Sequence, residues 1–217
     1  MVQKKTSAPK AAVSLEPRRR GRPRAYEPEQ AIGQALALFR KSGLAATSLD
    51  DLSAATGMNR PSLYGAFGDK RALYIQSYQR YRDDYAAELK ETFSADIGLR
   101  ERLRRIFAIA LDIYLLGEAP RGCFTVMTVA SDAIADPDIR AIVMQGLRDV
   151  DKAFNIAFRT AVEKGELLTS TDIAVRAEMA AATLFSLSIR ARAGVARGEL
   201  EAIVDGAIGL LCQDAAS

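Results

Sequence analysis

Apolar residues recur at helical spacing along almost the whole chain. The first such run begins after Pro28 and ends before Gly43, and its apolar side chains follow at intervals of three and four residues: Ile32, Ala35, Leu36 and Phe39. This spacing places side chains on one face of an α-helix. Proline suits the first helical turn, where its missing N–H group is not needed, and glycine commonly ends a helix. The pattern predicts a first helix over 28–43.

Eight further runs have the same period and are separated by glycine, proline or short polar side chains. They predict helices over about 49–56, 60–67, 70–93, 98–116, 121–134, 137–164, 172–195 and 199–213. No stretch alternates apolar and polar residues as a half-buried strand does. The expected fold is therefore all-α, with about nine helices.

Composition is that of a globular protein with a sizeable core. The chain has 217 residues, of which 49% are hydrophobic. No run approaches the roughly 20 apolar residues that span a bilayer, and residues 1–27 lack the apolar segment of a secretory signal. The expected location is therefore the cytoplasm, with no membrane contact.

The residues of common catalytic and metal sites are scarce. The chain has no histidine, and its two cysteines, Cys123 and Cys212, lie far apart in the sequence. This excludes Ser/His/Asp and Cys/His arrangements and argues against a transition-metal site. We expect no enzymatic activity, no metal and no cofactor.

Residues 48–67, SLDDLSAATGMNRPSLYGAF, have the pattern of a helix-turn-helix. Ser48 can cap the first helix with Asp51 at its third position, and Asn59 can cap the second. The second helix is narrow enough for the major groove of DNA. Its first-turn side chains Arg60 and Ser62 can reach base edges there.

Residues 28–75 resemble the amino-terminal DNA-binding domain of TetR-family transcriptional repressors. The resemblance lies in FRKSG at the end of the first helix, TSLDDLSAATGMNRPSLYGAF across the helix-turn-helix and GDKRALY at the start of the fourth helix. The nine-helix layout and the length are also similar to that family. The resemblance implies a DNA-binding domain over 25–72 and an effector-binding and dimerisation domain over 73–217, which follow residues 1–24.

The resemblance also implies roles for individual residues of the DNA-binding domain. Phosphate contacts fall on Thr47, Ser48 and Lys70, base contacts on Arg60, Pro61 and Ser62, and a sugar-phosphate contact on Tyr64. The sequence departs from the family at Gly65 and Ala66, where an aromatic residue or histidine is frequent, so a phosphate contact is open to doubt there. The alternatives are that Arg60 and Lys70 are ordinary solvated side chains and that Tyr64 is a packing residue.

A basic arm precedes this domain. Residues 1–27 hold eight lysine and arginine residues against two glutamates, whereas the whole chain has a net charge of only +3. The arm carries like charge and few apolar side chains, so we expect disorder over 1–24. Its RGRPR segment resembles the minor-groove core of an AT-hook, and we expect Arg20, Arg22 and Arg24 to enter the minor groove. The alternative is non-specific phosphate affinity.

The larger domain has inward-facing apolar positions that can line a ligand cavity. The candidate ligand-binding residues are Phe107, Tyr114, Cys123, Phe124, Met127, Phe154 and Phe158. Few charges fall on these faces, so a small apolar or aromatic effector is favoured over a sugar phosphate. Four tyrosines of the fourth helix form a second stripe that is either a packing face or part of the cavity or hinge: Tyr74, Tyr78, Tyr81 and Tyr85.

Cys123 lies at the predicted start of the sixth helix, beside Arg121. A helix N-terminus and a neighbouring cation both favour a thiolate. One hypothesis is therefore a sensor of electrophiles or oxidants, as in some members of the family. The alternative is a buried thiol that packs as a small apolar side chain.

The last two helices are rich in alanine and apolar residues. A stripe runs along the final helix: Leu200, Ile203, Val204, Ala207, Ile208 and Leu211. Apolar surface on a helix pair favours a partner, and the resemblance implies a homodimer through these helices. A two-fold dimer reads a palindromic operator.

The expected function is a repressor that an effector releases from double-stranded DNA. A helical enzyme or carrier and an architectural DNA-coating protein are the alternatives, and activation in place of repression stays open.

Overall fold

The computed structural model describes residues 27–117 and 121–213. Within these ranges the regular structure consists of nine α-helices and includes no strand, so the all-α prediction is confirmed. The helices are α1 (Pro28–Ala46), α2 (Leu49–Thr56), α3 (Arg60–Phe67), α4 (Lys70–Ser94), α5 (Leu99–Tyr114), α6 (Phe124–Ala130), α7 (Pro137–Glu163), α8 (Ile173–Arg192) and α9 (Arg197–Leu211). The predicted arm and its arginines Arg20, Arg22 and Arg24 lie outside the described residues.

Short polar side chains start α2 and α3 as predicted. Ser48 Oγ accepts from the backbone N–H of Asp51 at 3.1 Å, and the Asp51 carboxylate accepts in return from the N–H of Ser48 at 2.9 Å. Asn59 Oδ1 accepts from the N–H of Ser62 at 2.9 Å. These bonds satisfy N–H groups that have no partner within the helix.

Two helix boundaries differ from the prediction. The backbone leaves helical geometry at Gly43, with φ of 76°, and one more turn then continues α1 to Ala46. The helix α6 is much shorter than the predicted 121–134. It begins only after Gly122, whose φ is 64° and where a Cβ atom would lie 2.8 Å from the carbonyl oxygen of Ser188. Glycine is therefore required on both conformational and steric grounds.

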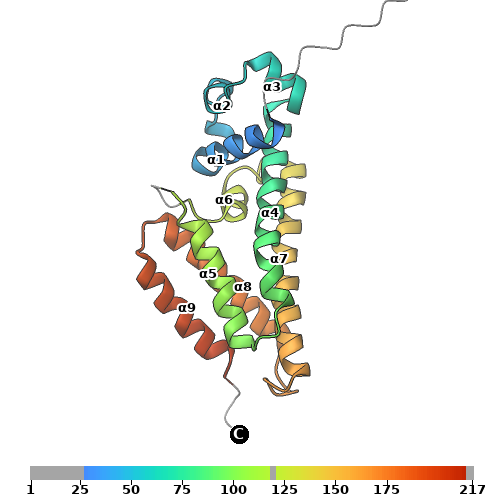
Figure 1. Ribbon diagram of the computed structural model, residues 1–217, viewed down its shortest axis with the longest axis vertical. Coiled ribbons are helices and arrows are strands. Elements are labelled where there is room, and N and C mark those ends of the chain that lie inside the picture. Colours follow the sequence, from blue (N-terminus) through green and yellow to red (C-terminus); the bar gives the residue numbers. More distant parts are fainter. Residues whose placement is uncertain (1–26, 118–120, 214–217) are drawn as a thin grey trace, which may run out of the picture.

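The helices form a small head and a larger body joined by one long helix. Figure 1 shows α1, α2 and α3 gathered at one end of the molecule, while α4 runs from this head along the body beside α7. The helices α5, α8 and α9 complete the body on the other side of α4. Since α4 is continuous across residues 72 and 73, the predicted domain boundary falls inside a helix.

The junction between head and body is polar and buried. The Asp132 carboxylate, just after α6, accepts from the Tyr74 hydroxyl of α4 at 2.8 Å and from the backbone N–H of Leu44 at 3.3 Å. Arg40 of α1 is 6% exposed, and its Nη2 donates to the carbonyl oxygens of Ile113 at 2.9 Å and Gly122 at 3.0 Å. These bonds hold α1 against α4, the end of α5 and the segment before α6.

The apolar stripe of the final helix lies inside the chain, whereas the sequence led us to expect it on a surface that binds a second copy. Leu200, Val204, Ile208 and Leu211 are buried within the chain, where α9 packs on α5 and α8. The stripe is therefore part of the internal core. The large apolar side chains that α8 and α9 expose are others: Val175, Met179, Ile189 and Leu210.

The polar junction yields a prediction for Tyr74→Phe. Burial raises the pKa of Tyr74 and keeps its phenol protonated, so the hydroxyl is a donor to Asp132. Its loss leaves a buried carboxylate with one donor fewer, and we expect the free energy of unfolding to fall by about 1–3 kcal/mol in urea denaturation. Tyr64→Phe, at an exposed position, is the control and should leave stability unchanged. Equal stability of the two variants would contradict the structural role of this hydroxyl.

Candidate functional site

The first turn of α3 presents its polar side chains to solvent. Arg60 and Pro61 are exposed, Ser62 is half-buried, and the opposite face buries Leu63 and Phe67 in the head. Tyr64 on the next turn is 49% exposed. Packing thus turns the predicted base-reading residues outward, as a recognition helix requires.

Arg60 is held beside this turn by an acidic residue of α2. Its Nε and Nη2 donate to the Asp50 carboxylate at 3.0 and 2.7 Å, and this pairing raises the pKa of Arg60. Both side chains are more than half exposed. Water screens an exposed ion pair and makes it weak, so the guanidinium can exchange onto another acceptor. The carboxylate orients Arg60 without locking it.

Two of the predicted phosphate-contacting residues close the turn between α1 and α2. Thr47 is 1% exposed, and its hydroxyl donates to the carbonyl oxygen of Gly43 at 2.6 Å. Lys70 Nζ donates to the carbonyl oxygens of Leu44 and Thr47, both at 2.8 Å. The Thr47 side chain is thus buried inside the head, whereas Ser48 is exposed. A phosphate contact by the Thr47 hydroxyl does not fit this conformation.

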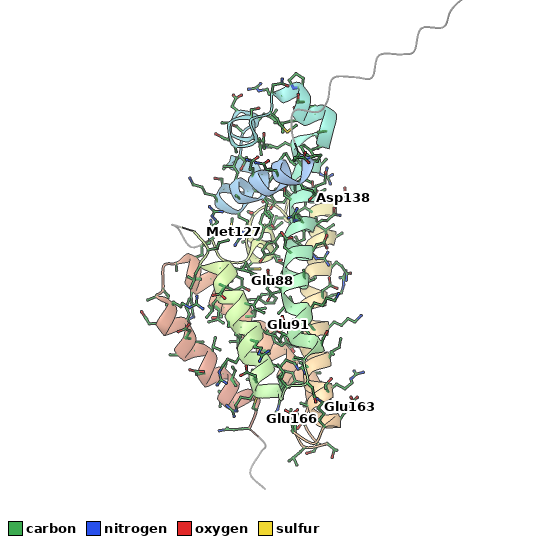
Figure 2. The ribbon with its side chains drawn as sticks, viewed as in Figure 1. Glu88, Glu91, Met127, Asp138, Glu163 and Glu166 are labelled. Atoms are coloured by element: carbon green, nitrogen blue, oxygen red, sulfur yellow. The ribbon has the colours of Figure 1, made fainter. Side chains whose placement is uncertain are left out.

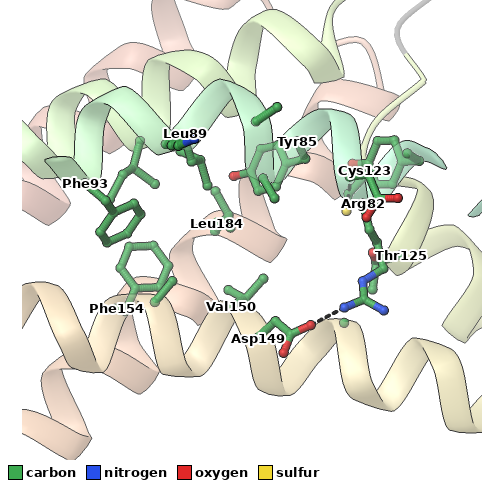
Figure 3. Close-up of a pocket in the computed structure, with 18 of the residues that line it drawn as sticks. Arg82, Tyr85, Leu89, Phe93, Cys123, Thr125, Asp149, Val150, Phe154 and Leu184 are labelled. Carbon is green, nitrogen blue, oxygen red and sulfur yellow. Dashed lines mark hydrogen bonds and ion pairs between the residues drawn. The ribbon is translucent and has the colours of Figure 1, made fainter. Parts of the chain in front are cut away.

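A cavity of about 620 Å³ lies in the body, between α4 on one side and α5, α7 and α8 on the other. Its volume is within the range of roughly 300–1,000 Å³ typical of small-molecule sites. Figure 3 shows Leu89, Phe93 and Phe154 around one end, with Arg82, Cys123 and Thr125 around the other. The cavity is therefore apolar at one end and polar at the other.

The structure brings only part of the predicted ligand set to this cavity. Tyr114, Cys123 and Phe154 line it. Four predicted residues do not: Phe107, Phe124, Met127 and Phe158. Three of these are fully buried aromatic core residues. The fourth, Met127, accepts a hydrogen bond at its sulfur from Arg192 at 2.7 Å.

Other lining residues were not in the predicted ligand set. Tyr81 and Tyr85 belong to the tyrosine stripe of α4, which was a weak signal for the cavity. Arg82 of α4 and Asp149 of α7 form an ion pair at its polar end, drawn as a dashed line in Figure 3. The sequence led us to expect few charged side chains facing the cavity, and this expectation is wrong at this point. The pair could not be predicted, because no local pattern links two residues 67 positions apart.

Cys123 is buried at the polar end of the cavity and precedes the first turn of α6. Its backbone N–H donates to Ser188 Oγ at 2.7 Å, and its sulfur accepts from the Tyr81 hydroxyl at 3.4 Å. The Arg40 guanidinium lies over the same Tyr81 ring, 5.4 Å from its centroid. Both the buried-thiol and the sensor hypotheses fit this placement, and the sensor role stays a prediction.

Two family models match the chain. The model of bacterial regulatory proteins of the tetR family matches residues 31–76, and that of the tetracyclin repressor-like C-terminal domain matches residues 100–201. The chain belongs to the TetR family of transcriptional regulators. The predicted family is thereby confirmed for both the head and the body.

Individual proteins that are similar to this chain agree with this assignment. The HTH-type transcriptional repressor ComR of Escherichia coli is 28% identical over 182 residues, which cover 83% of this chain and 87% of ComR. The repressor BdcR of the same organism is 34% identical over 125 residues, 58% of this chain and 62% of BdcR. A solved cysteine mutant of the TetR-family regulator CifR, in complex with 26-bp operator DNA, superposes with a TM-score of 0.81 at 26% identity. It covers 87% of this chain and 98% of CifR.

No helix in the described part of the chain is both long and apolar enough to cross a membrane. Side chains project from all of the helices in Figure 2, and acidic residues such as Glu88, Glu91 and Glu163 are among those labelled along the body.

The environment of Lys70 yields a prediction for Lys70→Met. This change removes two charge-assisted hydrogen bonds to backbone carbonyls, and we expect the free energy of unfolding in urea to fall by about 2 kcal/mol. Lys41→Met, at an exposed position near the end of α1, is the control and should have little effect. Unchanged stability together with weaker DNA binding would instead favour the phosphate contact that the family resemblance implies.

Proposed function

We propose that this chain is a dimeric TetR-family repressor that reads a palindromic operator through α3 and leaves it when a small molecule fills the body cavity. It acts in the cytoplasm and has no catalytic activity of its own. The observation that carries the proposal is the outward-facing first turn of α3, with Arg60 exposed and oriented by Asp50. ComR and BdcR are transcriptional repressors, and CifR has been solved on operator DNA, which supports the same function here.

Dimerisation is supported by the outer surface of α8 and α9. Four large apolar side chains are exposed there: Val175 and Met179 near the start of α8, Ile189 near its end, and Leu210 on α9. Apolar patches of this kind mark association sites in soluble proteins. A dimer in which a second copy of the chain covers them would present two heads, as a palindromic operator requires.

Release by an effector is supported by the course of α4. The helix begins at Lys70 in the head, passes Tyr74 at the junction, and reaches the cavity at Tyr81 and Tyr85. A ligand that binds better to one orientation of α4 shifts the population toward that orientation. We propose that the favoured orientation separates the two heads to a spacing that no longer matches successive major grooves.

Selection of bound fragments from a random DNA pool at near-physiological salt tests the operator reading. Wild-type protein should recover an inverted repeat, and Arg60→Ala should bind that repeat at least about tenfold more weakly, because a base contact is worth roughly 1–3 kcal/mol. Arg159→Ala removes the same charge from the exposed surface of α7 and is the matched control. Recovery of the same A·T-rich sequences by wild type and Arg60→Ala would instead favour an architectural DNA-binding protein.

A truncation lacking residues 1–24 tests the basic arm. We expect the loss of affinity to be greater on operators with A·T-rich flanks than on those with G·C-rich flanks, because arginine prefers a narrow minor groove. Binding constants on both operators at several salt concentrations measure this difference. An equal loss on both flanks would leave the arm as a salt-dependent phosphate tether.

A further inference from the structure

The cavity contains one polar group that the protein leaves without a partner. The hydroxyl oxygen of Tyr85 is buried, and within the described residues it forms no hydrogen bond. A buried hydroxyl with no partner destabilises a protein by about 1–3 kcal/mol. Burial also raises the pKa of Tyr85, so the group is a neutral phenol that can donate or accept one hydrogen bond.

Several other polar groups around the cavity are already engaged. The Tyr81 hydroxyl donates to the sulfur of Cys123, and the Thr125 hydroxyl is 3.1 Å from that of Tyr78. Arg82 and Asp149 neutralise each other across the gap between α4 and α7. The charged side chains at the cavity that are not in this pair, Asp83 and Lys90, are exposed at its rim. The interior thus offers a ligand no unpaired charge.

Toward Phe93 and Phe154, the surface beside Tyr85 is apolar. In Figure 3 the Tyr85 ring lies between the polar end of the cavity and the end formed by Leu89, Phe93 and Phe154, and its oxygen points toward Leu184. The Tyr85 hydroxyl oxygen is itself buried, so a group that contacts it is removed from water there. A charged group there would lose its hydration without gaining an opposite charge, which is strongly unfavourable.

We propose that the effector is an uncharged, mainly apolar molecule with one hydrogen-bonding oxygen, and that the Tyr85 hydroxyl is the group that recognises this oxygen. The inference rests on the proposed effector-responsive function and adds the chemical class of the ligand. A ketone or an aldehyde on a ring system or alkyl chain meets both requirements. Its oxygen accepts from Tyr85, and its carbon skeleton fills the end around Phe93 and Phe154.

Three probes of one shape test this class by isothermal titration calorimetry on the full-length protein without DNA. They are 2-acetonaphthone, its apolar analogue 2-isopropylnaphthalene and the anion 2-naphthoate. Tyr85→Phe should weaken binding of the ketone about tenfold while leaving the apolar analogue within about twofold, because the hydrogen bond is lost only for the ketone. Comparing the two probes on each variant cancels the different hydration of the probes.

Tyr74→Phe is the matched control, since it removes a buried hydroxyl of the same helix that is engaged by Asp132 and lies outside the cavity. It should leave the affinity for the ketone within about threefold. The proposal is overturned if Tyr85→Phe changes the affinity for both probes equally, if 2-naphthoate binds as tightly as the ketone, or if none of the three binds. Because no operator is present, each of these results leaves the DNA-reading test of the proposed function untouched.

Discussion

The position of the head on the body depends on a buried cation, the guanidinium of Arg40. Desolvation lowers the pKa of Arg40, and no carboxylate of the described residues forms an ion pair with it. Its charge is instead stabilised by the carbonyl oxygens of Ile113 and Gly122 and by the face of the Tyr81 ring. Each charge-assisted hydrogen bond contributes about 1.5–3 kcal/mol, so α1 cannot leave this position unless the guanidinium finds equivalent acceptors.

Tyr81 connects the Arg40 guanidinium to the cavity. One face of its ring lies under the Arg40 guanidinium, and its hydroxyl donates to the Cys123 sulfur, which itself lines the cavity. A ligand that displaces Tyr81 or Cys123 therefore disturbs the support of Arg40, in addition to any tilt of α4. The head is linked to the cavity by a packed contact through α1 and by a continuous helix, α4. Both routes involve contiguous, well-packed elements, which suits transmission between two discrete arrangements.

The sequence predicted those parts of the protein that depend on local interactions. The caps at Ser48 and Asn59 involve residues three positions apart, and a glycine with positive φ marks the break in α1. A few neighbouring residues are therefore enough to predict these features. The cavity was predicted less well. Periodicity identifies Phe107 and Phe154 alike as inward-facing, but whether such a side chain meets other side chains or empty space depends on how α4, α5, α7 and α8 pack. The pairing of Arg82 with Asp149 depends on the same packing.

The cavity sets a limit on what the proposed effector can do. A bound molecule makes packing contacts with side chains such as Phe93 and Leu184 and offers the Tyr85 hydroxyl a partner, so it adds stability to the fold. A ligand adds this stability in any state that it can enter. Only the part of its binding energy that differs between the two head arrangements shifts the equilibrium. Since the Arg40 bonds oppose movement of the head, a ligand that acts as proposed must bind the moved arrangement more tightly by at least the free energy that those bonds contribute to the arrangement described here.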